Sequence, residues 1–160
     1  MQFTQSISYP GTVDEVVAMH LTPAYLERRF GQFVVEGSQA VSVEGERVSF
    51  AGTVRPELIP AAAARFVKSD LRITFTEEWA RDEAGATSRT SVTVDDAPVS
   101  VEATSTLAPA DAGCIRDVTG NVSVRVPLLG GRIEKEAVSH LGRVVEREQA
   151  LAAQWLEEHR

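Results

Sequence analysis

The first residues of the chain alternate between apolar and polar side chains, a period of two that is typical of a strand with one buried face. The apolar set comprises Phe3, Ile7 and Tyr9. The dipeptide Pro10-Gly11 ends this strand. Thr12 and Glu15 then have the spacing of a reciprocal capping box and predict a short helix. A second short helix is predicted between Thr22 as its N-cap and Gly31 as its C-cap.

The period of two continues from Phe33 to Val126 and predicts about six further strands. Their alternating apolar positions are Val41 and Val43; Val48, Phe50 and Val54; Leu71, Ile73, Phe75 and Trp79; Val92 and Val94; Val99, Val101 and Leu107; and Val118, Val122, Val124 and Val126. Short separators rich in Gly, Asp and Pro join them, so we expect hairpins and an antiparallel meander. One longer interval, Pro56 to Ser69, is interpreted as a loop with a single helical turn at Ala61 to Arg65.

After Val126 the apolar residues recur with the period of a helix. We expect one continuous helix from Gly131 to Glu158, roughly 42 Å long. Its apolar stripe consists of Ile133, Ala137, Leu141, Val144, Leu151 and Trp155. About seven strands span roughly 29 Å, so this helix is long enough to cross the sheet diagonally. The predicted fold class is α+β: one domain over residues 1–160, with a seven-stranded antiparallel sheet wrapped around a long C-terminal helix.

Composition narrows the class of protein. A chain of 160 residues that is 43% hydrophobic is typical of one folded domain and excludes disorder. No apolar stretch reaches ~18 residues and the N-terminus lacks an export signal, so we expect a cytoplasmic protein without stable membrane insertion. The net charge of -7 argues against a nucleic-acid partner. The single cysteine, Cys114, cannot form an internal disulfide, and nothing indicates the oligomeric state.

Two stretches carry a more specific signal. They are PAAAARFVKSDLRITFTEEW at Pro60–Trp79 and VRVPLLGGRIE at Val124–Glu134. With the order of elements, they make the whole chain resemble the START-like (SRPBCC, helix-grip or birch-allergen-like) superfamily, which includes polyketide cyclases and lipid transport proteins. Within it, they are most similar to an uncharacterised actinobacterial family of unknown function. The resemblance implies the helix-grip fold and a cavity for a hydrophobic small molecule, and it carries over no catalytic residues.

A curved sheet and a straight helix do not fit flat against each other, so side chains or a ligand must fill the space between them. Small residues on or near the expected inner face favour a cavity, namely Gly37, Gly52, Ala103, Ser105 and Gly120. The alternative is that the glycines mark bulges and large neighbours fill the space. We interpret the domain as a module that binds a hydrophobic or amphipathic small molecule, lipid or polyketide-like, between the sheet and the C-terminal helix.

Two carboxylates interrupt the apolar pattern. Glu148 falls within the apolar stripe of the C-terminal helix, and Glu77 is in phase with the inward residues of its strand. Burial would raise the pKa of Glu148, whereas an arginine such as Arg116 or Arg55 beside it would lower the pKa. The alternative is a half-exposed Glu148 bridged to a surface arginine. A facing pair of these glutamates would suit general acid/base chemistry.

The candidate ligand-binding residues are those expected to face the cavity: Phe50, Phe75, Glu77, Trp79, Leu141, Val144, Glu148 and Trp155. The catalytic residues remain unknown. His20, His140 and His159 lack the spacing of a helical metal site, so no metal is expected. Neither a phosphate loop nor a dinucleotide fingerprint is present, so no cofactor is expected.

Two other functions stay open. The first is an aromatase, cyclase or dehydratase on the same scaffold that uses Glu77, Glu148 or His140. The second is an interaction protein whose cavity is filled by its own side chains. The sequence does not decide whether a reaction is catalysed, or whether the loop Pro56 to Ser69 is a lid.

Overall fold

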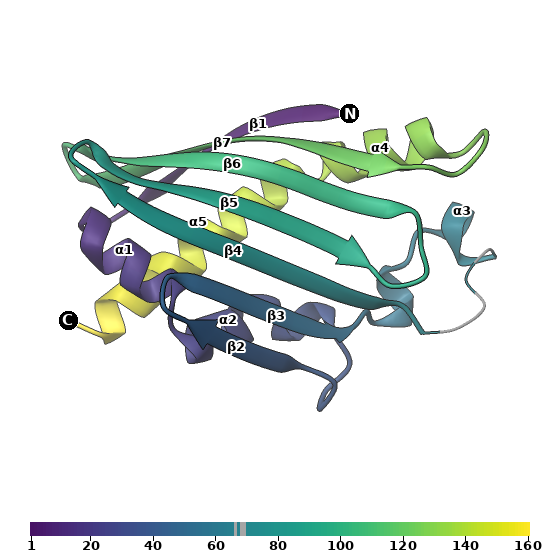
Figure 1. Ribbon diagram of the computed structural model, residues 1–160, viewed down its shortest axis with the longest axis horizontal. Coiled ribbons are helices and arrows are strands. Elements are labelled where there is room, and N and C mark those ends of the chain that lie inside the picture. Colours follow the sequence, from purple (N-terminus) through teal and green to yellow (C-terminus); the bar gives the residue numbers. More distant parts are fainter. Residues whose placement is uncertain (66, 68–69) are drawn as a thin grey trace.

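The computed structural model describes residues 1–65, 67 and 70–160. Within these residues, seven strands form one antiparallel sheet in the order β1-β7-β6-β5-β4-β3-β2 (Figure 1). The strands are β1 (Gln2–Tyr9), β2 (Ala40–Glu44), β3 (Arg47–Thr53), β4 (Arg72–Asp82), β5 (Gly85–Val94), β6 (Val99–Ala110) and β7 (Gly113–Val124). The predicted antiparallel meander is confirmed. β1 extends the sheet by pairing with the last strand, β7, and forms the edge opposite β2.

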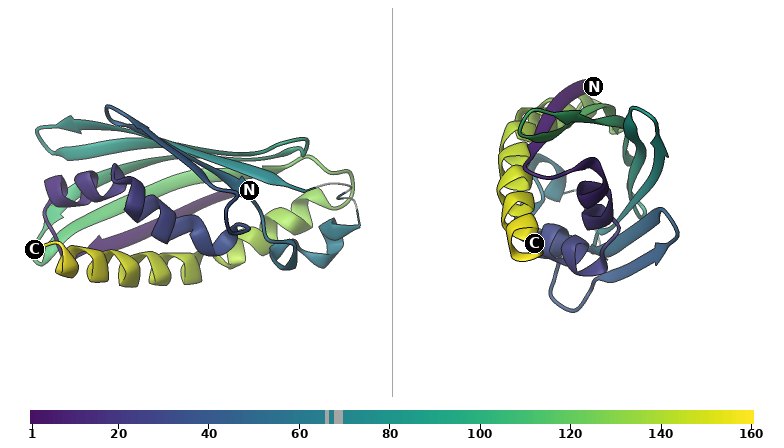
Figure 2. Two further views of the ribbon diagram at one scale, coloured as in Figure 1. Left: turned by 90° about the horizontal axis from the view of Figure 1, so that it is seen from below. Right: turned by 90° about the vertical axis from the view of Figure 1, so that its left-hand side faces the viewer.

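The helices and 3-10 turns (η) complete the predicted order. They are α1 (Val13–His20), α2 (Pro23–Phe30), η1 (Gly31–Phe33), η2 (Pro56–Leu58), α3 (Ala61–Ala64), α4 (Gly130–Ser139) and α5 (Leu141–Glu158). Figure 2 shows α1, α2 and α5 on the same face of the sheet. The predicted helical turn in the long interval is present as α3. Phe66, Lys68 and Ser69 of that interval lie outside the described residues.

The caps of the first two helices follow local sequence signals. Glu15 N donates to Thr12 Oγ1, and Thr12 N donates to Glu15 Oε1, which confirms the capping box of α1. Gly31 is the C-cap of α2, as predicted. Thr22 is its N-cap by position, but the Thr22 hydroxyl donates to the Ala18 carbonyl and makes no cap hydrogen bond. Through α1 and α2 the chain crosses one face of the sheet, from the edge formed by β1 towards the edge formed by β2 (Figure 2).

The prediction of one continuous C-terminal helix is wrong, because α4 ends at Ser139 and α5 begins at Leu141. Two residues account for the break. The Ser139 hydroxyl donates to the Glu136 carbonyl and so competes with the helical backbone. Gly142 adds a position that disfavours a helix by about 1 kcal/mol relative to alanine. Beyond the break, α4 packs against β7, and α5 packs against β1 and α2.

The buried face of α5 also differs from the predicted stripe. Its buried residues are Glu148, Ala152, Trp155 and Leu156. Val144 is 49% exposed, so its predicted inward orientation is wrong, and Val145 packs against the core in its place. Ala137 is exposed as well. The buried face of α5 therefore runs through Leu141, Val145, Glu148 and Ala152, one residue later than the predicted stripe at Val144.

The sheet register shows which side chains share the inner face, because directly opposed residues of antiparallel strands lie on the same face. One inward row consists of Glu77, Thr90, Ala103, Gly120 and Phe3. The next consists of Trp79, Ser88, Ser105, Val118 and Gln5. Both rows are rich in small residues on their central strands, β5 and β6.

The glycines expected to leave room for a cavity do not do so. A Cβ at Gly52 would lie 2.7 Å from a methyl carbon of Val34, and one at Gly120 would lie 2.5 Å from the Phe3 ring. Large neighbours therefore fill the space at both positions, which is the alternative that the sequence left open. Gly37 lies outside the strands, in a turn with a φ of 81° that glycine adopts without strain.

Candidate functional site

The inner face carries a buried salt bridge that spans the centre of the sheet. Arg116, on β7, reaches β4, where its Nη2 donates to Glu77 Oε1. On the way its Nε donates to Ser105 Oγ at 2.9 Å, and its Nη2 donates to Ser88 Oγ at 3.0 Å. Ser105 and Ser88 belong to β6 and β5, the two strands in between. Their small hydroxyl side chains leave room for the long arginine and accept its hydrogen bonds.

Glu148, on α5, is the second buried carboxylate. Its Oε2 lies 2.9 Å from Arg29 Nε, on α2. Its Oε1 lies 3.3 Å from His20 Nε2 and accepts hydrogen bonds of 3.3 Å from the hydroxyls of Tyr9 and Tyr25. Strand β1 and the helices α1, α2 and α5 therefore meet at one carboxylate. We call His20, Arg29, Glu77, Arg116 and Glu148 the ionic cluster.

The ionic cluster keeps both carboxyl groups charged. Burial alone would raise the pKa of Glu148, but the charge of Arg29 together with the hydrogen bond and charge of His20 holds it well below its usual range. Burial also opposes ionisation of Glu77, and the charges of Arg116, His20 and Arg29 outweigh it and lower its pKa. An ionised carboxylate has no proton to deliver, so this geometry favours an ionic anchor over general acid catalysis.

The tyrosines that face Glu148 remain neutral hydrogen-bond donors. Burial, followed by the charge of Glu148, raises the pKa of both Tyr9 and Tyr25. His20 Nδ1 lies 2.8 Å from the Val16 carbonyl, which can only accept, so this nitrogen carries a proton. His20 Nε2 then lies between Glu148 Oε1 at 3.3 Å and Arg116 Nη1 at 3.4 Å.

An apolar cavity of about 470 Å³ lies at the other end of the interior, beside α3 and α4. Its walls come from the β3–β4 loop, the β5–β6 turn, the end of β7 and α4. The lining residues are Val54, Leu58, Ile59, Pro60, Ala63, Val67, Leu71, Val94, Asp96, Ala97, Pro98, Val99, Val124, Val126 and Ile133. Asp96 is the one charged residue among them, and its φ of 58° places it in the left-handed region. The remaining lining side chains are apolar.

None of the eight residues predicted to bind a ligand lines this cavity. Glu77 and Glu148 belong to the ionic cluster. Trp79 and Trp155 lie in the core near α1, where the Trp79 ring lies 4.8 Å from the Arg116 guanidinium and the Trp155 ring lies 5.4 Å from that of Tyr25. The rings of this core are packed against protein groups.

The other predicted residues lie towards the middle of the molecule. Phe50 and Phe75 form an aromatic layer with Phe30, whose ring centroid lies 5.1 Å from that of Phe50 and 4.6 Å from that of Phe75. On β3 and β4 this layer lies between the row of Glu77 and the row of Ile73, whose partner Val94 lines the cavity. Leu141 is half-buried at the start of α5, and Val144 is exposed.

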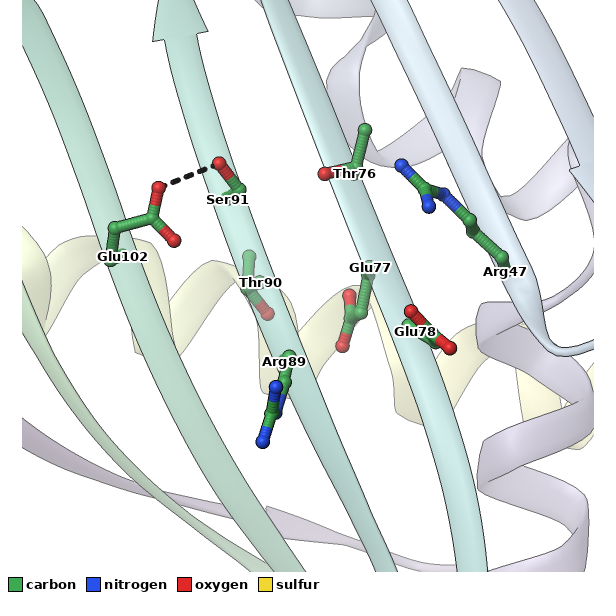
Figure 3. A pocket seen from close by; sticks show the side chains of 8 residues that line it. All are labelled: Arg47, Thr76, Glu77, Glu78, Arg89, Thr90, Ser91 and Glu102. Carbon is green, nitrogen blue, oxygen red and sulfur yellow. Dashed lines mark hydrogen bonds between the residues drawn. The ribbon is translucent and has the colours of Figure 1, made fainter.

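The outer face of the sheet is polar. A shallow pocket of about 110 Å³ lies there, and Figure 3 shows the residues around it, where Ser91 Oγ donates to Glu102 Oε1 at 2.8 Å. Arg47, Glu78 and Arg89 are neighbours in one cross-strand row. Glu78 is exposed whereas the adjacent Glu77 is buried, as the strand alternation predicts. Glu77 and Thr90, whose side chains belong to the inner face, also border this pocket, so it lies directly over the part of β4 that carries the ionic cluster.

The sheet that curves around α5, with α1 and α2 inserted after the first strand, is the START-like helix-grip fold. Solved structures share it: a conserved protein from Geobacillus kaustophilus is 17% identical with a TM-score of 0.59, covering 99% of this chain and 96% of that chain. A START superfamily protein from Mycobacterium smegmatis is 12% identical with a TM-score of 0.50, covering 93% and 97%. At these identities the likeness establishes the fold alone.

The family can be stated more narrowly. Residues 4–156 match the family described as "Protein of unknown function (DUF2505)", and the chain belongs to it. An uncharacterised protein of Mycobacterium tuberculosis, Rv0481c, is 25% identical over 96% of this chain and 95% of its own length. The predicted helix-grip fold and the match to an uncharacterised family with actinobacterial members are thus confirmed. Among the described residues, no helix is both long and apolar enough to span a membrane.

Sequence reasoning selected Glu77 and Glu148 but missed most of their partners. His20, Arg29, Tyr9 and Tyr25 were not candidates. The sequence contains one usable signal for His20. It lies four residues after the buried Val16 on α1, and residues with this spacing share one face of a helix. The others gave none, because an arginine near a helix end, a tyrosine on an inward strand face and a tyrosine on a short helix are ordinary features of any small domain.

Proposed function

We propose that this domain binds a hydrophobic or amphipathic small molecule, lipid or polyketide-like, with its apolar part in the cavity beside α3 and α4. The observation that carries the proposal is the cavity itself, whose volume of about 470 Å³ is lined almost entirely by apolar side chains. Small-molecule sites are mostly apolar and usually measure about 300–1,000 Å³. The START-like fold supports the same class of function without identifying the ligand.

The location of the cavity explains how the interior would take up such a molecule. The ionic cluster and the core near α1 fill the space under one half of the sheet. Under the other half, the cover consists of α4, α3 and loops, and the apolar walls there enclose a space that no side chain of the described residues fills. Apolar surface that remains uncovered in a folded domain is a common mark of a binding site.

A pair of variants on α3 tests the proposal. Ala63 lines the cavity, whereas the adjacent Ala64 is exposed and does not. Ala63→Phe should fill part of the cavity and weaken binding of the fluorescent apolar probe N-phenyl-1-naphthylamine at least tenfold. Ala64→Phe, the matched control, should leave its affinity unchanged. Fluorescence titration of the two variants and the wild type provides the measurement.

Two results would count against this function. One is the lack of saturable probe binding by the wild-type protein, together with native mass spectra that contain no bound apolar molecule. The other is equal probe affinity in Ala63→Phe and Ala64→Phe, which would place the probe outside the cavity.

A further inference from the structure

Within the ionic cluster, one buried donor atom and one buried acceptor atom lie close together but make no hydrogen bond. Among the described residues, the buried side-chain atoms that lack a hydrogen-bond partner are Arg29 Nη1, Glu77 Oε2 and Trp79 Nε1. Arg29 Nη1 and Glu77 Oε2 lie 3.7 Å apart, beyond the range of about 2.7–3.2 Å for an N–H···O hydrogen bond. Buried polar groups are normally paired, so this gap calls for a group that satisfies both atoms.

Arg29 stands at the border between the ionic cluster and the aromatic layer. Its guanidinium lies 4.7 Å from the centre of the Phe30 ring and 5.4 Å from that of Phe75. Its side chain is 17% exposed, whereas that of Glu77 is 1% exposed. Arg29 is therefore the member of the pair that an incoming molecule meets first.

The inward residues of β5 and β6 lead from the cavity towards this pair. Ser88 and Ser105, in the row of Trp79, are 3% and 4% exposed. The inward residues nearer the cavity are only half-buried, and they are Thr90, Val92, Val101 and Ala103. Since these positions share the same strands and the same face, the difference reflects looser cover on the helix side. The inner face is therefore less tightly covered in this half of the sheet than near Ser88 and Ser105.

The distance between the cavity wall and the Arg29–Glu77 gap follows from the strand geometry. Val94 lines the cavity and pairs with Ile73 on β4. Glu77 lies two inward positions further along the same strand, past Phe75. Each such step measures about 6.7 Å, so the Glu77 row is about 13 Å from the cavity wall. A ligand with an extended apolar chain in the cavity can place one end group at the Arg29–Glu77 gap after the aromatic layer adjusts.

We infer that the ligand carries a hydroxyl group, which accepts a hydrogen bond from Arg29 Nη1 and donates one to Glu77 Oε2. This inference rests on the proposed function and adds the chemical class of the ligand. A hydroxyl has both a donor and an acceptor, as the gap requires. An ether or ketone only accepts, and a carboxylate only accepts and would also face the charge of Glu77. An alkane leaves both protein atoms unpaired.

The experiment compares 1-hexadecanol, whose chain is long enough to reach the Glu77 row while its tail remains in the cavity, with its methyl ether by isothermal titration calorimetry. The wild-type protein should bind the alcohol at least tenfold more tightly, because the ether leaves Glu77 Oε2 unpaired. In Glu77→Gln, the amide oxygen can still accept from Arg116 and the amide NH2 can donate to either ligand, so the preference should vanish. Glu78→Gln changes the exposed neighbour on the outer face and should keep the wild-type preference.

The outcomes separate this inference from the function on which it rests. Equal affinities for alcohol and ether in the wild type would overturn the hydroxyl site and leave the apolar binding function standing. Failure of the wild type to bind either compound would overturn both. The wild-type ratio can overturn the inference even if Glu77→Gln does not fold. A preference that persists in a folded Glu77→Gln would place the hydroxyl elsewhere and overturn it as well.

Discussion

The inner face of the sheet is tightly covered near α1 and loosely covered near α3, although the same strands run through both regions. Near α1, the inward residues Ala86 and Leu107 are 2% and 1% exposed, and the helices α1, α2 and α5 cover them. Near α3, the inward residues Val94 and Val99 on the same strands are only half-buried and line a cavity. Since the strands continue through both regions, the difference comes from what covers them.

The cover changes where the C-terminal helical segment breaks at His140. Before the break, α4 packs along β7, and beyond it α5 packs against β1 and anchors in the ionic cluster through Glu148. The inner face is thus covered by paired and packed side chains at one end, whereas at the other end the described residues leave a cavity. The comparison teaches that the burial of an inward residue on β5 or β6 depends on which helix or loop covers it, and not on its strand.

The largest effect is expected from breaking the ionic cluster. Glu148→Leu removes the carboxylate that pairs with Arg29 at 2.9 Å and accepts from Tyr9 and Tyr25, so the free energy of unfolding should fall by about 3–5 kcal/mol. Glu146→Leu, on the exposed face of the same helix, should change it by about 0.5 kcal/mol or less. Urea denaturation measures both. A loss below about 1 kcal/mol for Glu148→Leu would mean that the ionic cluster does not anchor α5.

A smaller effect should separate the two ends directly. Val48 is fully buried beside Glu77 on β3, and Val99 is half-buried at the cavity on β6. Val48→Ala should cost about 2 kcal/mol of unfolding free energy, and Val99→Ala about 1 kcal/mol or less, because fewer contacts are lost where the wall already faces open space. Thermal or urea unfolding of the pair gives the comparison, and equal losses would argue that the cavity end is as tightly packed as the other.

Much of this fold was predictable because its signals are local. Alternation along β4 placed Phe75, Glu77 and Trp79 on one face, and the Thr12–Glu15 capping box fixed the start of α1. The two buried glutamates were recognisable because a carboxylate at an apolar phase is costly unless it is paired.

The rest depends on contacts between distant parts of the chain. Tyr9, Tyr25 and His20 meet Glu148 across 123 to 139 residues of sequence, and no periodicity within one element reports such a contact. The position of the cavity depends on how η2, α3 and α4 fold over the end of the sheet. The helix break at His140 arises from weak preferences of Ser139 and Gly142, which an otherwise regular apolar pattern concealed.

The most direct test of this account is an amide NMR titration of the wild-type protein with 1-decanol. We predict saturable shift changes for Val94, Val99, Val124 and Ile133 at the cavity, with little change for Val16 and Leu156 in the core near α1. Shift changes confined to the region near α1, or changes that never saturate, would contradict the claim that the uneven interior is a ligand site.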